Sequence, residues 1–226
     1  MVDTELEEYR RKFIAAFGLG VGGLALDGFI GSAAAAETPA SGPSGNDFQA
    51  WLKSIPGKYR QVYDMTEPNG GFGLIWSFVY LLTGPQAFGV PESDLGVVVV
   101  VRHNATPIAL ADAAWSKYKL GEFFKINDPA TKAPALRNPF NNIKPGDMPA
   151  PDAAIDKLVP RGVKITVCNM AITFYSGMVA KQIGADPAAV KKDWTDNVLP
   201  GIHIAPSGVV ALNGAQAVGC KYVFAG

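Results

Sequence analysis

The sequence of residues 95–102 is Leu-Gly-Val-Val-Val-Val-Val-Arg, and this stretch decides the fold. The run of valines from Val97 to Val101 leaves no polar face, so both faces of a strand here must be covered. An uninterrupted β-branched run is typical of a central strand in a parallel sheet. The sequence therefore predicts an α/β fold with helices packed on both faces of the sheet.

Strands and helices are predicted to alternate along the rest of the chain. Short apolar runs predict further strands at residues 58–65, 163–167, 202–205 and 219–224. Apolar or capped segments predict helices at residues 74–82, 109–118, 153–159, 170–183, 187–198 and 207–217. Such alternation predicts a three-layer fold with a mostly parallel sheet. Residues 127–151, rich in Pro, Asn, Lys and Gly, are expected to form a long inserted loop over one face or at an oligomer contact.

Residues 1–36 have the layout of an export signal peptide. Adjacent Arg10 and Arg11 precede an apolar, glycine-rich stretch at residues 15–26, and small residues follow as far as Ala36. The paired arginines resemble a twin-arginine signal, which carries folded proteins across a bacterial inner membrane. We therefore expect a periplasmic protein that is cleaved near Ala36 and has no membrane contact afterwards. The alternative is a protein tethered to the membrane through an uncleaved signal.

Residues 37–57 are expected to be a linker with a short docking helix near Phe48 to Leu52, and residues 58–226 to form the α/β domain. The chain carries 20 basic and 20 acidic residues, and no basic cluster follows a predicted helix face. A nucleic-acid partner is therefore not expected. The sequence has no closely spaced cysteine or histidine ligands such as C-x-x-C, so neither a metal nor a cofactor is expected.

Cys168 is the most informative single residue. It directly follows the apolar run at residues 163–167 and directly precedes a helix-like stretch that begins near Asn169. Backbone N–H groups at a helix N-terminus stabilise an anion, so a thiol in this position is a candidate nucleophile or sulfur carrier. The alternative is a small buried core residue, because free cysteine is usually buried and inert.

Polar groups or turn glycines follow three of the predicted strands. They are Asn69, Gly70, Gly71, His103, Asn104, Cys168 and Asn169. Ligands of parallel sheets bind beyond the carboxyl ends of the strands, so we expect one shared ligand-binding site here, with Cys168 as its catalytic residue. His103 is expected to be hydrogen-bonded to a loop at the strand end, and the alternative is a proton donor beside the thiol.

The chain contains two cysteines, Cys168 and Cys220. In an oxidising compartment they could form one disulfide. The sequence argues against this bridge, because the two residues flank different predicted strands and a disulfide needs Cα atoms within about 7 Å.

Four aromatic residues belong to one strongly apolar segment. They are Phe72, Trp76, Phe78 and Tyr80. We expect them to form the buried face of a helix and not a cofactor-binding box.

Residues 162–171, Gly-Val-Lys-Ile-Thr-Val-Cys-Asn-Met-Ala, are similar to the cysteine-bearing strand and turn of the DsrE/DsrF-like (YchN-like) sulfur-relay family. The closing segment, residues 199–222, and the valine strand that runs into His103 resemble the same family. The resemblance covers residues 58–226 outside the inserted loop. It implies a small α/β fold that assembles as a homo-trimer or hexamer, with a persulfide on Cys168 exchanged with a sulfur donor or acceptor protein.

The sequence thus leads to a periplasmic protein that binds or relays sulfane sulfur as a persulfide on Cys168. The alternative is a non-catalytic module that binds a small ligand or assembles as an oligomer, with Cys168 buried.

Overall fold

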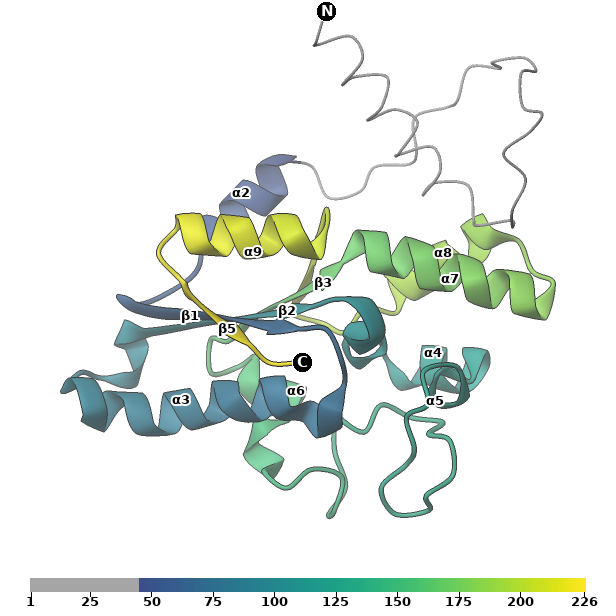
Figure 1. The fold of residues 1–226 in the computed structure, drawn as a ribbon, viewed down its shortest axis with the longest axis horizontal. Coiled ribbons are helices and arrows are strands. Elements are labelled where there is room, and N and C mark those ends of the chain that lie inside the picture. Colours follow the sequence, from purple (N-terminus) through teal and green to yellow (C-terminus); the bar gives the residue numbers. More distant parts are fainter. Residues whose placement is uncertain (1–44) are drawn as a thin grey trace, which may run out of the picture.

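A computed structural model describes residues 45–226 (Figure 1). The expected export signal with its cleavage site near Ala36, and residues 37–44 of the expected linker, lie outside the described residues. Within the described part, no helix has the length and apolar character needed to cross a membrane.

A five-stranded, all-parallel sheet forms the middle layer, with the strand order β4-β3-β2-β1-β5. Its strands are β1 Tyr59–Met65, β2 Leu95–Val101, β3 Lys164–Cys168, β4 Ile202–Ala205 and β5 Lys221–Phe224. The valine run is the central strand β2, and all of its residues are buried. The prediction made from residues 95–102 is confirmed, because only a strand covered on both faces can bury five successive valines.

Helices cover both faces of the sheet, as the three-layer prediction requires (Figure 1). One face carries α3 (Phe72–Phe88) and α6 (Ile155–Leu158), and the opposite face carries α2 (Gly45–Lys53) and α9 (Gly208–Ala217). The core is accordingly divided into a large cluster on the α3 side and a smaller one on the α2 and α9 side.

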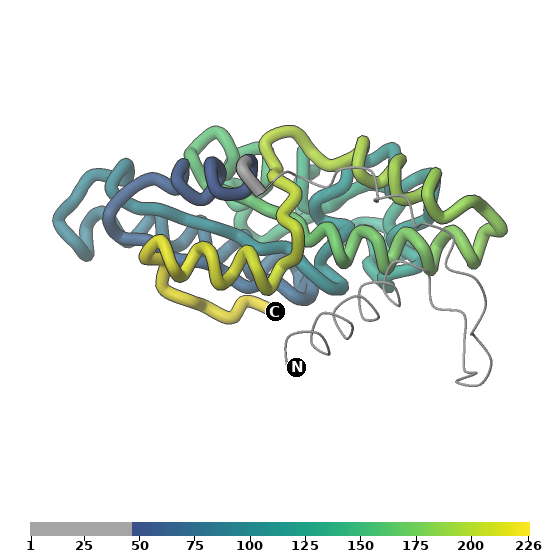
Figure 2. The backbone as a smooth tube through the Cα atoms, turned by 90° about the horizontal axis from the view of Figure 1, so that it is seen from above, coloured from purple at the N-terminus to yellow at the C-terminus, as the bar shows by residue number. Residues whose placement is uncertain are grey.

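The remaining helices lie toward one end of the sheet. They are α4 (Asp112–Tyr118), α5 (Leu120–Phe123), α7 (Asn169–Ile183) and α8 (Pro187–Asp196). Helices α7 and α8 pack side by side at that end of the molecule (Figure 2). Short 3-10 helices span Asn69–Gly71, Glu92–Asp94, His103–Ala109 and Pro151–Ala153.

Helix α2 is more than a docking segment. Phe48, Leu52 and Ile55 are buried in the smaller core cluster. Residues 45–47, which were expected to belong to a flexible linker, are already helical. Residues 45–47 are polar or glycine, so their composition alone did not indicate a helix. The helix forms because the apolar residues that follow pack against the sheet.

The prediction that Phe72 and Trp76 are buried is wrong. They are 41% and 45% exposed, and their rings stack on the outside of α3 with centroids 5.6 Å apart. Helix α3 is apolar on all sides, so hydrophobic periodicity cannot distinguish its buried face from its exposed one. Phe78 and Tyr80 are partly buried against the core, closer to the expectation.

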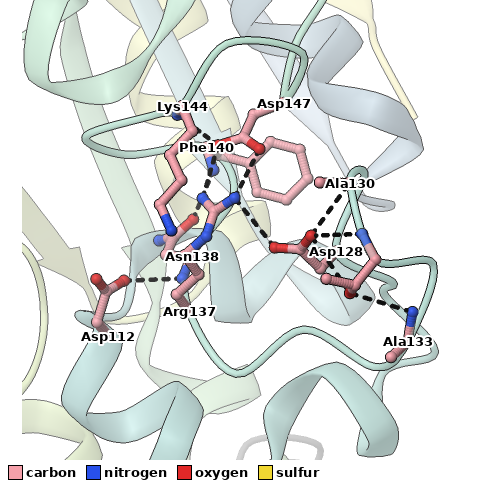
Figure 3. Close-up of polar contacts among 10 residues, drawn as sticks. Asp112, Asp128, Ala130, Ala133, Arg137, Asn138, Phe140, Lys144 and Asp147 are labelled. Atoms are coloured by element: carbon pink, nitrogen blue, oxygen red, sulfur yellow. Dashed lines mark hydrogen bonds and ion pairs between the residues drawn. The ribbon is translucent and has the colours of Figure 1, made fainter.

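Residues 127–151 form the expected irregular loop, which is held together by a charged cluster (Figure 3). Arg137 forms a two-pronged ion pair with Asp147, at 2.6 and 2.7 Å, and a further ion pair with Asp128 at 3.0 Å. The Asn138 side chain donates to the carbonyls of Ile108 and Leu110 and so ties the loop to the domain. The loop is therefore built into the fold.

Candidate functional site

Cys168 ends β3 and caps the N-terminus of α7. Its Sγ accepts a hydrogen bond from the backbone N–H of Ala171 at 3.3 Å. The predicted junction of strand and helix is therefore confirmed. The thiol is more enclosed than an open carrier surface requires, because Cys168 is only 7% exposed.

Arg102 lies beside Cys168 on the neighbouring strand. The β2–β3 register pairs Val101 with Val167, which brings Arg102 level with Cys168. Side chains alternate along each strand, so both residues project from the sheet face covered by α2 and α9.

Asp64 and Tyr222 extend this arrangement across the next two strands. Arg102 donates from Nε to Asp64 Oδ1 at 2.6 Å and from Nη2 to Asp64 Oδ2 at 2.8 Å. The Tyr222 hydroxyl donates to the same Asp64 Oδ2 at 2.8 Å. The four side chains Tyr222, Asp64, Arg102 and Cys168 thus come from β5, β1, the end of β2 and β3, which are consecutive in the sheet. We call this set the carboxyl-end row.

The neighbours within the row shift the pKa values of Arg102 and Tyr222. The hydrogen bonds to Asp64 are the main cause that raises the pKa of Arg102, and the charges of Asp64, Tyr222 and Cys168 add to it against the opposing effect of burial. Burial, followed by the interaction with Asp64, raises the pKa of Tyr222. Arg102 therefore remains a cation, and Tyr222 remains a hydrogen-bond donor to Asp64.

The sequence reasoning missed Arg102, Asp64 and Tyr222. The local signals were weak, since Asp64 stands between Tyr63 and Met65 in a predicted strand that also contains Lys58 and Arg60, and Arg102 directly follows the valine run. The contacts of Asp64 with Arg102 and Tyr222 depend on the order of the strands in the sheet, which no short stretch of sequence reveals.

His103 does not supply the charge beside the thiol. It lies exposed with a left-handed backbone at φ 49°, and its carbonyl accepts a hydrogen bond from the Thr106 hydroxyl at 2.6 Å. The hydrogen bond to the following turn is thus made by the carbonyl of His103 and not by its ring.

Asn104 links two other parts of the same sheet edge. Its Nδ2 donates to Glu67 Oε1 at 2.7 Å, and its Oδ1 accepts from the Tyr175 hydroxyl on α7 at 2.9 Å. Asn169 is half-buried in the first turn of α7, next to Cys168. Asn104 thus connects the loop after β1 to α7.

Asn69 and Gly70 line a different cavity. A pocket of about 360 Å³ lies between the turn after β1 and the inserted loop. Its lining includes Glu67, Lys125 and Phe140, but neither His103 nor Cys168. The turn after β1 leads to the α3 side of the sheet, whereas the Cys168 side chain projects toward the α9 side, so this pocket does not bring Asn69 and Gly70 together with Cys168.

Gly71 has a packing role beneath this pocket. Its φ is 83°, and a Cβ here would lie 2.8 Å from Met148 Cε and 3.1 Å from Phe140 Cδ1. A glycine is needed so that the turn can adopt a left-handed backbone and the inserted loop can pack closely against it.

Cys220 and Cys168 are both free and lie too far apart for a disulfide. Cys220 precedes β5, three strand positions from β3, and neighbouring strands are about 4.8 Å apart, so the separation exceeds the roughly 7 Å limit for a bridge. Burial raises the pKa of the Cys220 thiol to about 11, although Arg60 acts in the opposite direction. Cys220 is therefore a poor nucleophile at neutral pH.

Among residues 45–226, no group of three His, Cys, Asp or Glu side chains is arranged to hold a metal ion.

Comparison with known proteins assigns no family. No family model matches the chain, and no curated protein matches it. One solved structure, a protein of unknown function from Methanobacterium thermoautotrophicum, is 17% identical over 74% of this chain and 99% of that chain, with a TM-score of 0.38. A likeness at that level supports no argument about function.

Proposed function

We propose that this protein is an exported sulfane-sulfur carrier of the DsrE/DsrF-like kind, which holds the sulfur as a persulfide on Cys168. The main support is the setting of the sulfur. Sγ accepts a backbone N–H in the first turn of α7, and Arg102 directly follows the neighbouring strand β2, level with Cys168. The N–H groups of a helix N-terminus and a cation both attract an anion, and they would attract an anionic sulfur donor to this place.

The proposed reaction is an exchange of one sulfur atom. The thiolate of Cys168 attacks the sulfane sulfur of a donor and forms a new S–S bond. The bond between that sulfur and the rest of the donor breaks, and its electron pair leaves with the donor remnant. The product is a persulfide anion on Cys168, and an acceptor thiolate later reverses the process. No external oxidant or reductant is consumed.

A direct test is the mass of the native protein after exposure to inorganic polysulfide. We expect one added sulfur atom on wild-type protein, removed again by dithiothreitol, and none on Cys168→Ser. Cys220→Ser is the matched control and should load like the wild type, because its thiol is buried and weakly ionised. Loading of Cys168→Ser equal to that of the wild type would refute the assignment.

A second candidate function is a small-ligand-binding module in which Cys168 serves only as a helix cap. The pocket of about 360 Å³ beside Asn69 and Gly70 and the low exposure of Cys168 favour it. This alternative predicts that Cys168 reacts with iodoacetamide only after denaturation. The carrier predicts alkylation of Cys168 in the folded protein.

We further propose that the protein is a homo-oligomer, a trimer or hexamer, in the periplasm. Helix α3 carries no charged residue over its entire length, and Phe72, Trp76, Leu82 and Phe88 on it are exposed. An exposed apolar face of this kind is characteristic of a surface that another protein chain covers. The periplasmic assignment is supported by the sequence of residues 1–36.

A further inference from the structure

We propose that Arg102 binds the negative charge of a small anionic sulfane-sulfur donor next to Cys168, with Asp64 and Tyr222 as the residues that position Arg102. This inference rests on the proposed function and specifies its substrate class. It gives the carboxyl-end row a function in substrate binding. If Cys168 served only as a helix cap, the other residues of the row would not be needed beside it.

The first argument is the set of donors that Arg102 has left. A guanidinium has five N–H donors, and the two bonds to Asp64 engage only Nε and one N–H of Nη2. Within residues 45–226, Nη1 has no hydrogen-bond partner. A side-on pair of this kind directs the remaining edge of the guanidinium away from Asp64 and leaves it available to an anionic oxygen or sulfur.

The second argument is the order in which an approaching anion meets the two charges. The Asp64 side chain is 2% exposed and the Arg102 side chain is 18% exposed. Tyr222 also donates to the buried carboxylate and disperses its charge. An anion that arrives from solvent therefore meets the cation and is shielded from the carboxylate behind it.

The third argument is that the position of Arg102 is fixed from two sides. Asp64 holds the guanidinium, and Gly208 at the start of α9 leaves room for the aliphatic stem. A Cβ at Gly208 would lie 2.7 Å from Arg102 Cδ and 2.9 Å from Arg102 Cβ. A long side chain held in this way loses little further freedom when it binds an anion, which favours binding.

Thiosulfate illustrates the chemistry of the proposed donor class. The Cys168 thiolate attacks the outer sulfur of thiosulfate, the S–S bond of thiosulfate breaks, and sulfite leaves with the bonding electron pair. Charge is conserved, because a monoanion and a dianion give the persulfide anion and the sulfite dianion. Without a nearby cation, the attacking thiolate and the dianion would repel each other.

The test compares two alkylating reagents that differ in charge. Both iodoacetate and iodoacetamide react with the thiolate, so the ratio of their rate constants cancels any effect on thiol ionisation and isolates the attraction of the negative charge. We would measure this ratio at Cys168 in the otherwise wild-type chain carrying Cys220→Ser, relative to free cysteine.

We expect the ratio of the iodoacetate to the iodoacetamide rate constant in the native protein to exceed that of free cysteine by about fivefold, since one nearby unit charge in a solvated site contributes an effect of this order.

The double variant Asp64→Asn with Arg102→Gln removes both charges and should abolish the excess. Arg102→Lys should retain part of it. Tyr222→Phe should lower it by about half, because Arg102 is less firmly held. Arg161→Met, which removes a surface arginine paired with Glu92, is the control and should leave it unchanged.

An unchanged ratio in a folded double variant would overturn the proposal. If the double variant does not fold, an unchanged ratio in both Arg102→Lys and Tyr222→Phe would do the same, as would a ratio in the starting protein no higher than that of free cysteine. The assay separates this inference from the carrier function. Loading of Cys168 by polysulfide without any charge preference contradicts only the role of Arg102. A charge preference without loading contradicts only the sulfur chemistry.

Discussion

Cys168 and Arg102 illustrate what a sequence can and cannot reveal about single residues. The cap position of Cys168 is predictable because the change from a strand pattern to a helix pattern occurs within a few neighbouring residues. The partners of Arg102 are not predictable in this way. Asp64 and Tyr222 are far from it in sequence, and only the order β2-β1-β5 brings them together. Long-range pairing of this kind is a property of topology.

The two glycines of the β1 turn give a matched pair of substitutions. Gly71→Ala should lower the free energy of unfolding by about 2–3 kcal/mol, because it combines a left-handed backbone with a clash against Met148. Gly70→Ala should lower it by only about 1 kcal/mol, since its φ is 61° but no atom lies within 4 Å of the added Cβ. Urea unfolding measures both. Equal losses would show that contact with the inserted loop does not determine the choice of glycine at residue 71.

At the scale of elements, the sequence predicted most strands and helices, because apolar runs and caps such as Asp186 and Ser207 mark them locally. It did not reveal which face of α3 is exposed, because that helix is apolar all round. It also placed the β1 turn and Cys168 in one site. The carboxyl ends of the strands do share an edge, but the turn after β1 leads toward the α3 side of the sheet, whereas the Cys168 side chain projects toward the α9 side.

The inserted loop should depend on Arg137. The Asp147 side chain is 1% exposed and is held by Arg137, whose hydrogen bonds are the main cause that lowers the pKa of Asp147. Arg137→Met leaves this carboxylate without its cation and should cost about 3 kcal/mol in urea unfolding. Arg161→Met breaks an exposed pair and should cost less than about 1 kcal/mol. Similar losses in the two variants would contradict the view that the loop is part of the fold.

Helix α2 should make stability depend on pH through His203. The His203 ring stacks on Trp51 with centroids 5.0 Å apart, and burial lowers its pKa against the opposing charge of Asp47. The unfolded chain therefore binds a proton more readily than the folded one. Stability should be fully present above the unfolded pKa, about 6.5, and should decline as the pH falls below it.

His203→Gln is the control for this effect, because it cannot titrate in that range. Urea unfolding at pH 7.5 and pH 5.5 should show a smaller loss in His203→Gln than in the wild type. An identical loss in both proteins would assign the pH dependence to other groups.

At the scale of the whole molecule, the fold class was predictable from the valine run and from the alternation of strands and helices. The three layers and the parallel sheet are what the valine run requires. Oligomeric assembly is harder to predict from the sequence. An apolar helix face has the same sequence pattern whether a sheet or a second chain covers it.

The oligomer prediction concerns the exposed face of α3. Leu82 is 63% exposed on a helix without charges. Leu82→Glu would place a charge in the proposed contact and should reduce the mass measured by light scattering to that of a smaller species. Gln86→Glu is the control, because Gln86 is an exposed residue of the same helix that is already polar. It should reduce the measured mass less than Leu82→Glu does. A monomeric wild-type protein at micromolar concentration would contradict the assembly.

The measurement that tests the central claim most directly is the intact mass of native protein carrying Cys220→Ser after treatment with polysulfide. We expect one extra sulfur atom, located on Cys168 by peptide mapping and lost on reduction. A Cys168 that gains no sulfur while the protein is folded, but reacts fully once it is denatured, would contradict the claim that this residue carries sulfur.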